Sequence, residues 1–187
     1  MKEIKEKIEN GIQLSPREEL KLVSSTDAAA VELIWKYVDT HPLSVVAATE
    51  LVKRGDEGLI KHHIRKHKLC LEAEIELVNL GRSELIKVYA KERSFLNDAE
   101  DKLVITQNPE LIRAYLRERP LKVSAQVELV KSGNVELVQS LINLQPICDL
   151  AQFELVRLGD KDLLLLYLSN GGQLCARAWQ YWMISHS

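Results

Sequence analysis

The chain has 187 residues, of which 46% are hydrophobic and 28% are charged, and its formal net charge is −2. A chain of this length can bury one sizeable core, and its nearly balanced charge by itself indicates neither a nucleic-acid nor a membrane partner. The longest apolar run, residues 163–168, is too short to cross a bilayer, and no charged-then-apolar leader opens the sequence. We therefore expect a cytoplasmic protein that does not bind a membrane.

The cysteines provide a second indication of the compartment. Cys70, Cys148 and Cys175 are an odd number, and the first two occupy equivalent positions of the repeat described below. Equivalent positions of distant repeats lie far apart, so reduced cysteines in a cytosolic protein are favoured over a disulfide.

Residues 1–13 are predicted to form an N-terminal capping helix. Ile4 and Ile8 lie four residues apart in a charged segment, as on one face of a short helix. Ser15 followed by Pro16 then indicates the start of a new helix, because serine caps a helix N-terminus and proline suits the first helical position. The first repeat begins here, at residue 14, and carries three additional residues around positions 25–27.

A 26-residue repeat follows, and its first half is defined by three columns of equivalent residues. An alanine column contains Ala47, Ala73, Ala99, Ala125 and Ala151. Four and five residues later lie a leucine column (Leu51, Leu77, Leu103, Leu129, Leu155) and a valine column (Val52, Val78, Val104, Val130, Val156). A break then follows at Gly55, Gly81, Gln107, Gly133 and Gly159. Glycine can adopt the left-handed conformation that ends a helix, so each break separates two helices.

The second half of the repeat has the same helical spacing. It begins at a second leucine column (Leu33, Leu59, Leu85, Leu111, Leu137, Leu163) and includes a tyrosine column (Tyr37, His63, Tyr89, Tyr115, Leu141, Tyr167). Apolar residues three to five apart indicate helices, and short helices must bury their apolar faces against neighbouring repeats. We therefore predict an all-α fold: a right-handed α-solenoid of about six helix-pair repeats over residues 14–172, within a single domain of residues 1–187.

The sixth repeat differs because residues 163–168 are apolar on all sides, with Leu165 and Leu166 at positions that are polar or small in earlier repeats. We expect residues 173–187 to form a C-terminal capping helix whose segment 174–184, rich in tryptophan and tyrosine, covers these leucines. The alternative is that these aromatic side chains are a free anchor for a partner.

Several of these features resemble known helical repeats. The break Gln107-Asn108-Pro109 is followed by Leu111-Ile112 and Tyr115-Leu116, and the unit closes with a connection that contains Leu121 and Ser124. These short units resemble HEAT-like repeats, and their length is similar to that of leucine-rich variant repeats. The resemblance covers roughly residues 14–184. It implies a scaffold or adaptor, since such solenoids usually bind other macromolecules.

The candidate binding residues lie on the predicted second helices. Basic residues recur two, six and eight positions after the second leucine column, and equivalent residues of stacked repeats lie about 10 Å apart. The predicted partner-binding residues are one aromatic side chain, Trp35, and a set of cations that we call the basic ladder: Lys61, Arg65, Lys87, Lys91, Arg93, Arg113, Arg117 and Arg119. Such a stripe could bind an acidic peptide or a phosphate backbone.

An alternative interpretation is that the ladder is a solvated face that pairs with its own acidic residues. Glu84 precedes Lys87 by three residues and Glu110 precedes Arg113 by three, which is the spacing of intrahelical ion pairs. Trp35 could contact the N-terminal helix or be an exposed anchor, and Leu144 is a further apolar surface candidate.

No catalytic motif or metal site is indicated. His62, His63 and His67 include a pair four residues apart, but His63 belongs to the tyrosine column and is predicted to be a half-buried structural residue. No phosphate-binding loop or nucleophile arrangement is present. We therefore predict a non-enzymatic scaffold that binds a protein partner, without cofactor, metal or small-molecule substrate.

Two alternative functions remain. The first is nucleic-acid binding through the basic ladder, although the ladder contains no aromatic residues for base stacking. The second is a DNA glycosylase, an activity that occurs among HEAT-like proteins and that would require a catalytic carboxylate in a cleft.

Overall fold

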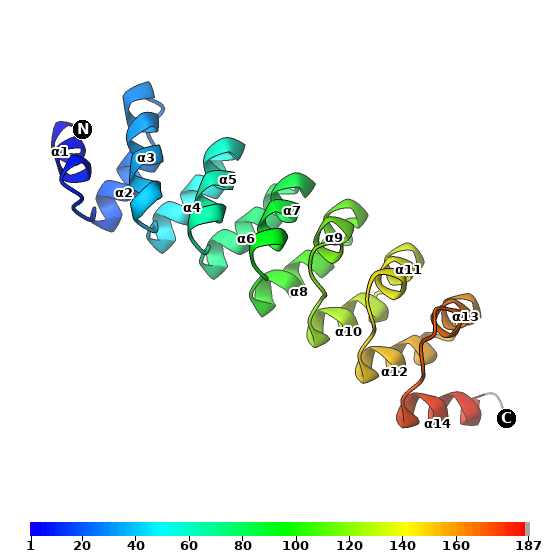
Figure 1. Cartoon of the computed structure of the whole chain (residues 1–187). Coiled ribbons are helices and arrows are strands. Elements are labelled where there is room, and N and C mark those ends of the chain that lie inside the picture. The colour runs from blue at the N-terminus through cyan, green and yellow to red at the C-terminus, as the bar shows by residue number, and fades with distance from the viewer. Residues whose placement is uncertain (186–187) are drawn as a thin grey trace. The chain divides into compact units, whose positions relative to one another are not determined.

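The computed structural model describes residues 1–185, which contain 14 helices and no strand (Figure 1). This confirms the all-α prediction. The contacts divide the chain into two units, Met1–Ser94 and Phe95–Ser187, and each is described by itself. The prediction of one domain over residues 1–187 stays a prediction, and residues 186 and 187 of the expected C-terminal capping helix lie outside the described residues.

Unit 1 contains seven helices within its described residues: α1 (Lys2–Glu9), α2 (Pro16–Val23), α3 (Ala28–Thr40), α4 (Val45–Arg54), α5 (Glu57–Lys66), α6 (Leu71–Leu80) and α7 (Ser83–Glu92). Helices α2, α4 and α6 correspond to the predicted first halves of the repeats and pack in succession. Helices α3, α5 and α7 correspond to the second halves and also pack in succession, while α1 packs on α3. We call these two sets the first and second helices.

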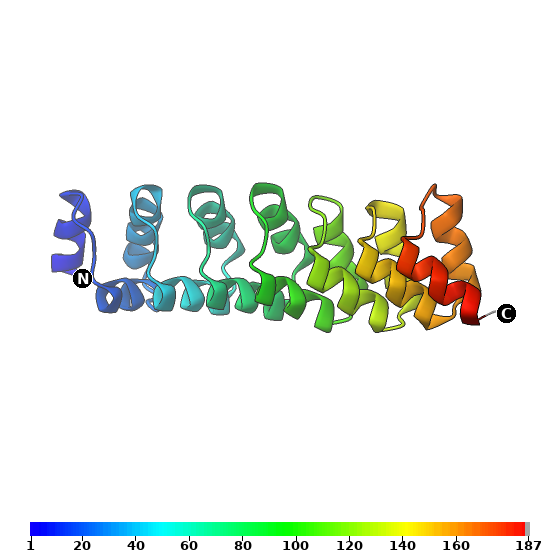
Figure 2. The same cartoon turned by 90° about the horizontal axis from the view of Figure 1, so that it is seen from below.

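Unit 2 repeats this packing order. Its helices are α8 (Asn97–Ile105), α9 (Pro109–Leu116), α10 (Val123–Lys131), α11 (Val135–Leu144), α12 (Asp149–Leu158), α13 (Lys161–Ser169) and α14 (Ala176–Ser185). The first helices α8, α10, α12 and α14 pack in that order, as do the second helices α9, α11 and α13 (Figures 1 and 2). Helix α14 is therefore placed as a first helix.

The predicted helix boundaries have the expected local causes. Ser15 and Glu18 form a reciprocal capping box at the start of α2, with Pro16 at its first turn. The break between the two helices of a repeat lies in the left-handed region even where it is not glycine: φ is +71° at Gly55 and +51° at Gln107. Asn108 then caps α9 through its side chain, which compensates for the strained position before it.

The core consists of the predicted columns. All members of the alanine column and of both leucine columns are buried, and so is the tyrosine column. The prediction that the C-terminal segment covers the apolar face of the sixth repeat is wrong for Leu165, which is 64% exposed. The reason is that α14 packs on α12 as the next first helix, so it does not lie over the outer face of α13.

Candidate functional site

A buried polar column holds the connections between repeats in place. It lies directly after the alanine column and contains Glu19, Glu74, Glu100, Gln126 and Gln152, with Ala48 as its one apolar member. In unit 1, Glu19 accepts a hydrogen bond from the Tyr37 hydroxyl at 2.7 Å and another from the Ser44 backbone N–H at 2.7 Å. Glu19 therefore ties a tyrosine of the second helix to the loop that starts the next repeat.

The contact with the loop that starts the next repeat recurs in unit 2. Side-chain oxygens of Glu100, Gln126 and Gln152 accept from the backbone N–H of the residue that precedes the next first helix, at distances of 2.6, 2.8 and 2.7 Å. Burial raises the pKa of Glu100, while hydrogen bonds and the nearby Lys122 ammonium oppose that rise. The Glu100 carboxyl group thus has structural partners, the Lys122 N–H and the Lys122 ammonium.

Sequence reasoning missed this column, although a signal was present. The polar residue lies 15 positions before the tyrosine column in four of the six repeats, and 18 before it in the first repeat, where three residues are inserted. In a single repeat such a Glu or Gln looks like a surface residue. Only the fixed spacing to a buried tyrosine indicates that the two side chains meet.

Repeat two breaks the pattern, because Ala48 faces a position where His63 replaces tyrosine. His63 is 1% exposed, so the prediction of a half-buried residue underestimated its burial. Neither of its ring nitrogens has a hydrogen-bond partner. Burial, together with repulsion from His67, His62 and Arg93, lowers the pKa of His63 to about 4.

In unit 1 the predicted partner-binding residues fall into different environments. Lys61 pairs with Glu57 at 3.4 Å within α5, whereas Arg65 and Lys87 are exposed and have no ion pair among residues 1–94. The predicted pair of Lys87 with Glu84 is therefore wrong. Lys91 is also exposed, and Arg93 is half-buried with its Nε enclosed.

The structure places Trp35 against the next second helix, a contact that neither prediction included. Its ring lies 4.7 Å from that of His62 on α5, and a Cβ built on Gly58 would also contact it. Trp35 therefore fills the space between two successive second helices, α3 and α5. We call such a space a seam, and it leaves the indole half-buried.

In unit 2 part of the basic ladder also lies in a seam, where it forms internal pairs. Arg113 donates to Glu136 at 2.7 Å and to the Ser140 hydroxyl at 3.0 Å, both on α11, so the predicted pairing with Glu110 is wrong. Arg117 is exposed at the end of α9 and has no ion pair among residues 95–185, while Arg119 is half-buried.

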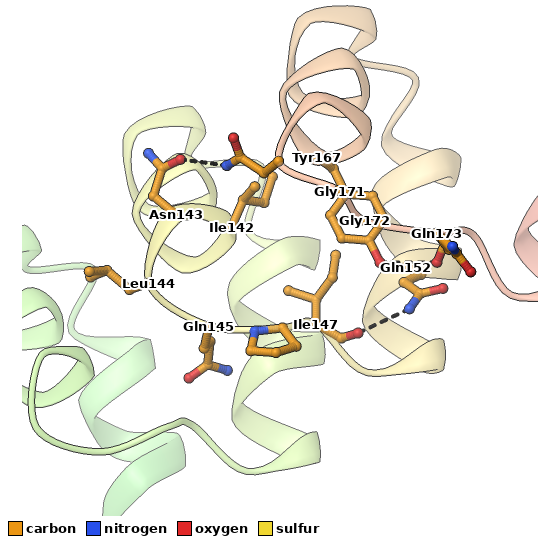
Figure 3. Close-up of a pocket in the computed structure, with 12 residues that line it drawn as sticks. Ile142, Asn143, Leu144, Gln145, Ile147, Gln152, Tyr167, Gly171, Gly172 and Gln173 are labelled. Carbon is orange, nitrogen blue, oxygen red and sulfur yellow. Dashed lines mark hydrogen bonds between the residues drawn. The ribbon is translucent and has the colours of Figure 1, made fainter.

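An open hollow of about 770 Å³ lies where α11 and α13 end (Figure 3). It is lined by Ile142, Asn143, Leu144, Gln145, Pro146, Ile147, Gln152, Tyr167, Asn170, Gly171, Gly172 and Gln173, none of which is ionised at neutral pH. Leu144, the predicted apolar candidate, is 44% exposed at its rim. Asn170 donates to Asn143 at 2.8 Å across the hollow's upper edge, and the lining contains no acidic residue.

The seam column explains why the hollow exists. Eight residues after the second leucine column lie His41, His67, Arg93, Arg119, Gln145 and Gly171. Two of these side chains form hydrogen bonds with the preceding repeat. His67 Nε2 donates to the Val38 carbonyl at 2.6 Å, and Gln145 Oε1 accepts from the Leu121 N–H at 2.7 Å. At Gly171 the same column provides no side chain.

The end of unit 2 carries a further apolar surface. Trp179 stacks on Trp182 at 5.3 Å, Tyr181 packs edge-on against Phe153, and Arg177 lies 4.2 Å from the Phe153 ring centre. Trp179 is nevertheless 46% exposed. The aromatic side chains of α14 thus pack against α12 and remain partly accessible to solvent.

No group of three or more His, Cys, Asp or Glu residues within residues 1–185 is placed to hold a metal ion, and the three cysteines are free thiols. None of the helices described is long and apolar enough to cross a membrane. Comparison with family models, curated proteins and solved structures found no match to the chain.

Proposed function

We propose that the chain is a right-handed α-solenoid of about six helix pairs that acts as a binding module for a protein partner. The recurring columns and the successive packing of alternate helices in each unit support this architecture. Partner binding is supported by those cations of the second helices that are exposed and form no internal ion pair. Lys61 and Arg113 pair internally and are excluded from this role.

One observation carries the proposal: exposed cations without internal partners lie on the second helices of both units. They are Arg65 and Lys87 in unit 1 and Arg117 in unit 2. A structural ion pair would fix these side chains to the fold, but each extends into solvent, where it can meet acidic groups of another protein. In unit 2 the hollow lies at the corresponding helix ends one and two repeats further along, which adds a concave uncharged surface.

Charge reversal tests this proposal. We expect Arg65→Glu combined with Lys87→Glu, and separately Arg117→Glu, to reduce partner capture from an extract of the native cell by at least about ten-fold, since each removes an attraction and adds a repulsion. Circular dichroism should show unchanged helical content because these side chains are exposed. Lys53→Glu is the matched control, since Lys53 is an exposed cation on a first helix.

The same variants separate a protein partner from nucleic acid. Capture that survives nuclease treatment and depends on Arg65 and Lys87 supports the proposal. Tight binding to duplex DNA or RNA with a steep salt dependence, lost in these variants, would replace it with nucleic-acid recognition. Capture that is equal in all variants would show that the ladder is only a solvated face.

A further inference from the structure

We propose that the hollow between α11 and α13 is a receptor for a primary carboxamide, the side-chain group of glutamine or asparagine, presented by a partner protein. This inference rests on the proposed function, because the partner is the source of the carboxamide. It concerns a site in unit 2 that does not include the basic ladder. The hollow corresponds to the place that His67 and Gln145 occupy in their own repeats.

The acceptor in the hollow is the Ile142 carbonyl. The last carbonyls of a helix have no intrahelical donor unless the chain continues as a helix. Pro146, four residues after Ile142, has no N–H, so this carbonyl cannot be satisfied by its usual donor. In repeat one the equivalent carbonyl, that of Val38, accepts from His67. Among residues 95–185 no side chain donates to the Ile142 carbonyl in this way, because position 171 is glycine.

The donor in the hollow is the Ile147 backbone N–H. Its equivalent one repeat earlier is the N–H of Leu121, which donates to Gln145 Oε1 at 2.7 Å. The Tyr167 hydroxyl donates to the Gln173 carbonyl at 3.1 Å, and Ile147 has no hydrogen-bond acceptor among the described residues of unit 2. Ile147 is 4% exposed and lines the hollow, so its N–H is shielded from bulk solvent. A buried N–H without an acceptor gains from a ligand that supplies one.

A primary carboxamide has one carbonyl and one NH₂ group, so it can accept from Ile147 and donate to Ile142 at the same time. The chain itself provides a precedent for the accepting half of this contact: Gln145, at the seam position one repeat earlier, accepts from the Leu121 N–H through Oε1, while its Nε2 has no hydrogen-bond partner. An arginine would leave the Ile147 N–H unsatisfied because guanidinium has no acceptor. A carboxylate would bring charge into an uncharged lining that is flanked by the C-terminal end of α11, where negative charge is disfavoured.

The lining leaves this position open for an outside group. Figure 3 shows Gln145 pointing away from Tyr167 and the two glycines, so it does not fill the hollow. A Cβ at Gly172 would overlap the Tyr167 ring, whereas a Cβ at Gly171 would meet nothing within 4 Å. Glycine at 171 therefore keeps the entrance clear, and glycine at 172 lets the tyrosine form the wall.

The test is a titration of the whole chain with N-acetyl-glutamine methylamide, followed through backbone amide resonances by NMR. We expect saturable shifts at Ile147, Gly171 and Gly172. The norleucine analogue, which lacks the carboxamide, should produce none. Gly171→Asn should weaken binding at least about five-fold, the equivalent of roughly one hydrogen bond, because asparagine tolerates the left-handed conformation and places its own carboxamide in the seam.

Gly159→Asn is the matched control, since Gly159 has a similar φ of +74° with open space around it and lies outside the hollow. It should leave the affinity unchanged. Gln145→Ala should add a second set of shifts at Leu121, because it opens the preceding seam; its helical content is checked by circular dichroism. If Gln145→Ala does not fold, the pair of asparagine variants still decides the question.

The inference is overturned if the norleucine analogue shifts the same amides, if the arginine analogue binds more tightly than the glutamine probe, or if Gly171→Asn binds unchanged. Concentration-dependent shifts at Gly171 without probe would mean that a second copy of the chain occupies the hollow. This result would overturn the inference that a different protein supplies the carboxamide. Failure here is distinguishable from failure of the proposed function, which is measured by partner capture in the Arg65, Lys87 and Arg117 variants.

Discussion

The two units treat the same repeat positions in opposite ways. In unit 1 the seam between α3 and α5 is closed by His67, while the buried polar column is interrupted at Ala48 and leaves His63 without a partner. In unit 2 the polar column is continuous from Glu100 to Gln152, while the last seam is open at Gly171. A residue missing from the interior thus leaves an unsatisfied core group, whereas one missing from a seam leaves an accessible hollow.

The largest expected effect comes from removing a hydrogen-bond acceptor, Glu19, from the buried polar column of unit 1, which already lacks one at Ala48. Glu19→Ala removes the partner of the Tyr37 hydroxyl and of the Ser44 N–H, both in the buried network. We expect the free energy of unfolding to fall by about 3–4 kcal/mol, because two polar groups are left unsatisfied in a buried site. Chemical denaturation measures this change.

Glu19→Gln is the control for that variant, since it keeps an acceptor oxygen and should lose less than half as much. If the alanine and glutamine variants are equally stable, the hydrogen bonds of this column contribute little. The contrast between the interrupted and the continuous column would then have no energetic meaning.

The second expected effect is a pH dependence of stability caused by His63, in the repeat where Ala48 interrupts the buried polar column. The pKa of His63 is about 4 in the folded chain and its ordinary value is 6.5, so the unfolded chain binds the proton more tightly. The contribution of neutral His63 is therefore fully present above about pH 6.5 and is lost as the pH falls towards 4, by at most about 3 kcal/mol.

Denaturation curves between pH 7.5 and pH 4, conditions we choose to span the two pKa values, check this slope. His63→Tyr is expected to flatten it, because tyrosine is the usual residue of the column and does not titrate in this range. An unchanged slope in His63→Tyr would mean that other groups cause the acid sensitivity and that His63 is hydrated or paired in solution.

The sequence predicts the elements of this fold well because their causes are local. Helix ends follow from Ser15, Pro16 and the glycine column, and the buried faces follow from the helical spacing of leucine, valine and tyrosine. Even Gln107 is predicted correctly, since a turn residue and the Asn108-Pro109 helix start substitute for glycine there.

The contacts between repeats were less predictable because they join residues more than 20 positions apart. Arg113 has Glu110 at the right intrahelical spacing, yet it pairs with Glu136 on the neighbouring helix, where Ser140 adds a second acceptor. Leu165 belongs to an apolar run, but sequence alone does not say which helix lies beside it. The hollow could have been inferred from glycine in a column of His, Arg and Gln, once that column was known to fill a seam.

The smallest expected effect makes the closed seam of unit 1 resemble the open seam of unit 2. His67→Ala removes the donor to the Val38 carbonyl and should lower the free energy of unfolding by about 1 kcal/mol, the net contribution of one hydrogen bond. Because the vacated position is then shaped for an imidazole, added imidazole at pH 8 should restore part of the thermal stability of this variant. It should not stabilise the unaltered chain, where His67 already fills the site. Equal effects of imidazole on both chains would mean that removing the side chain lets α3 and α5 collapse together. In that case an open seam would need the rigid glycine pair and tyrosine wall that only residues 167–172 of the described chain provide, and Gly171 would be one part of a built site instead of a simple deletion.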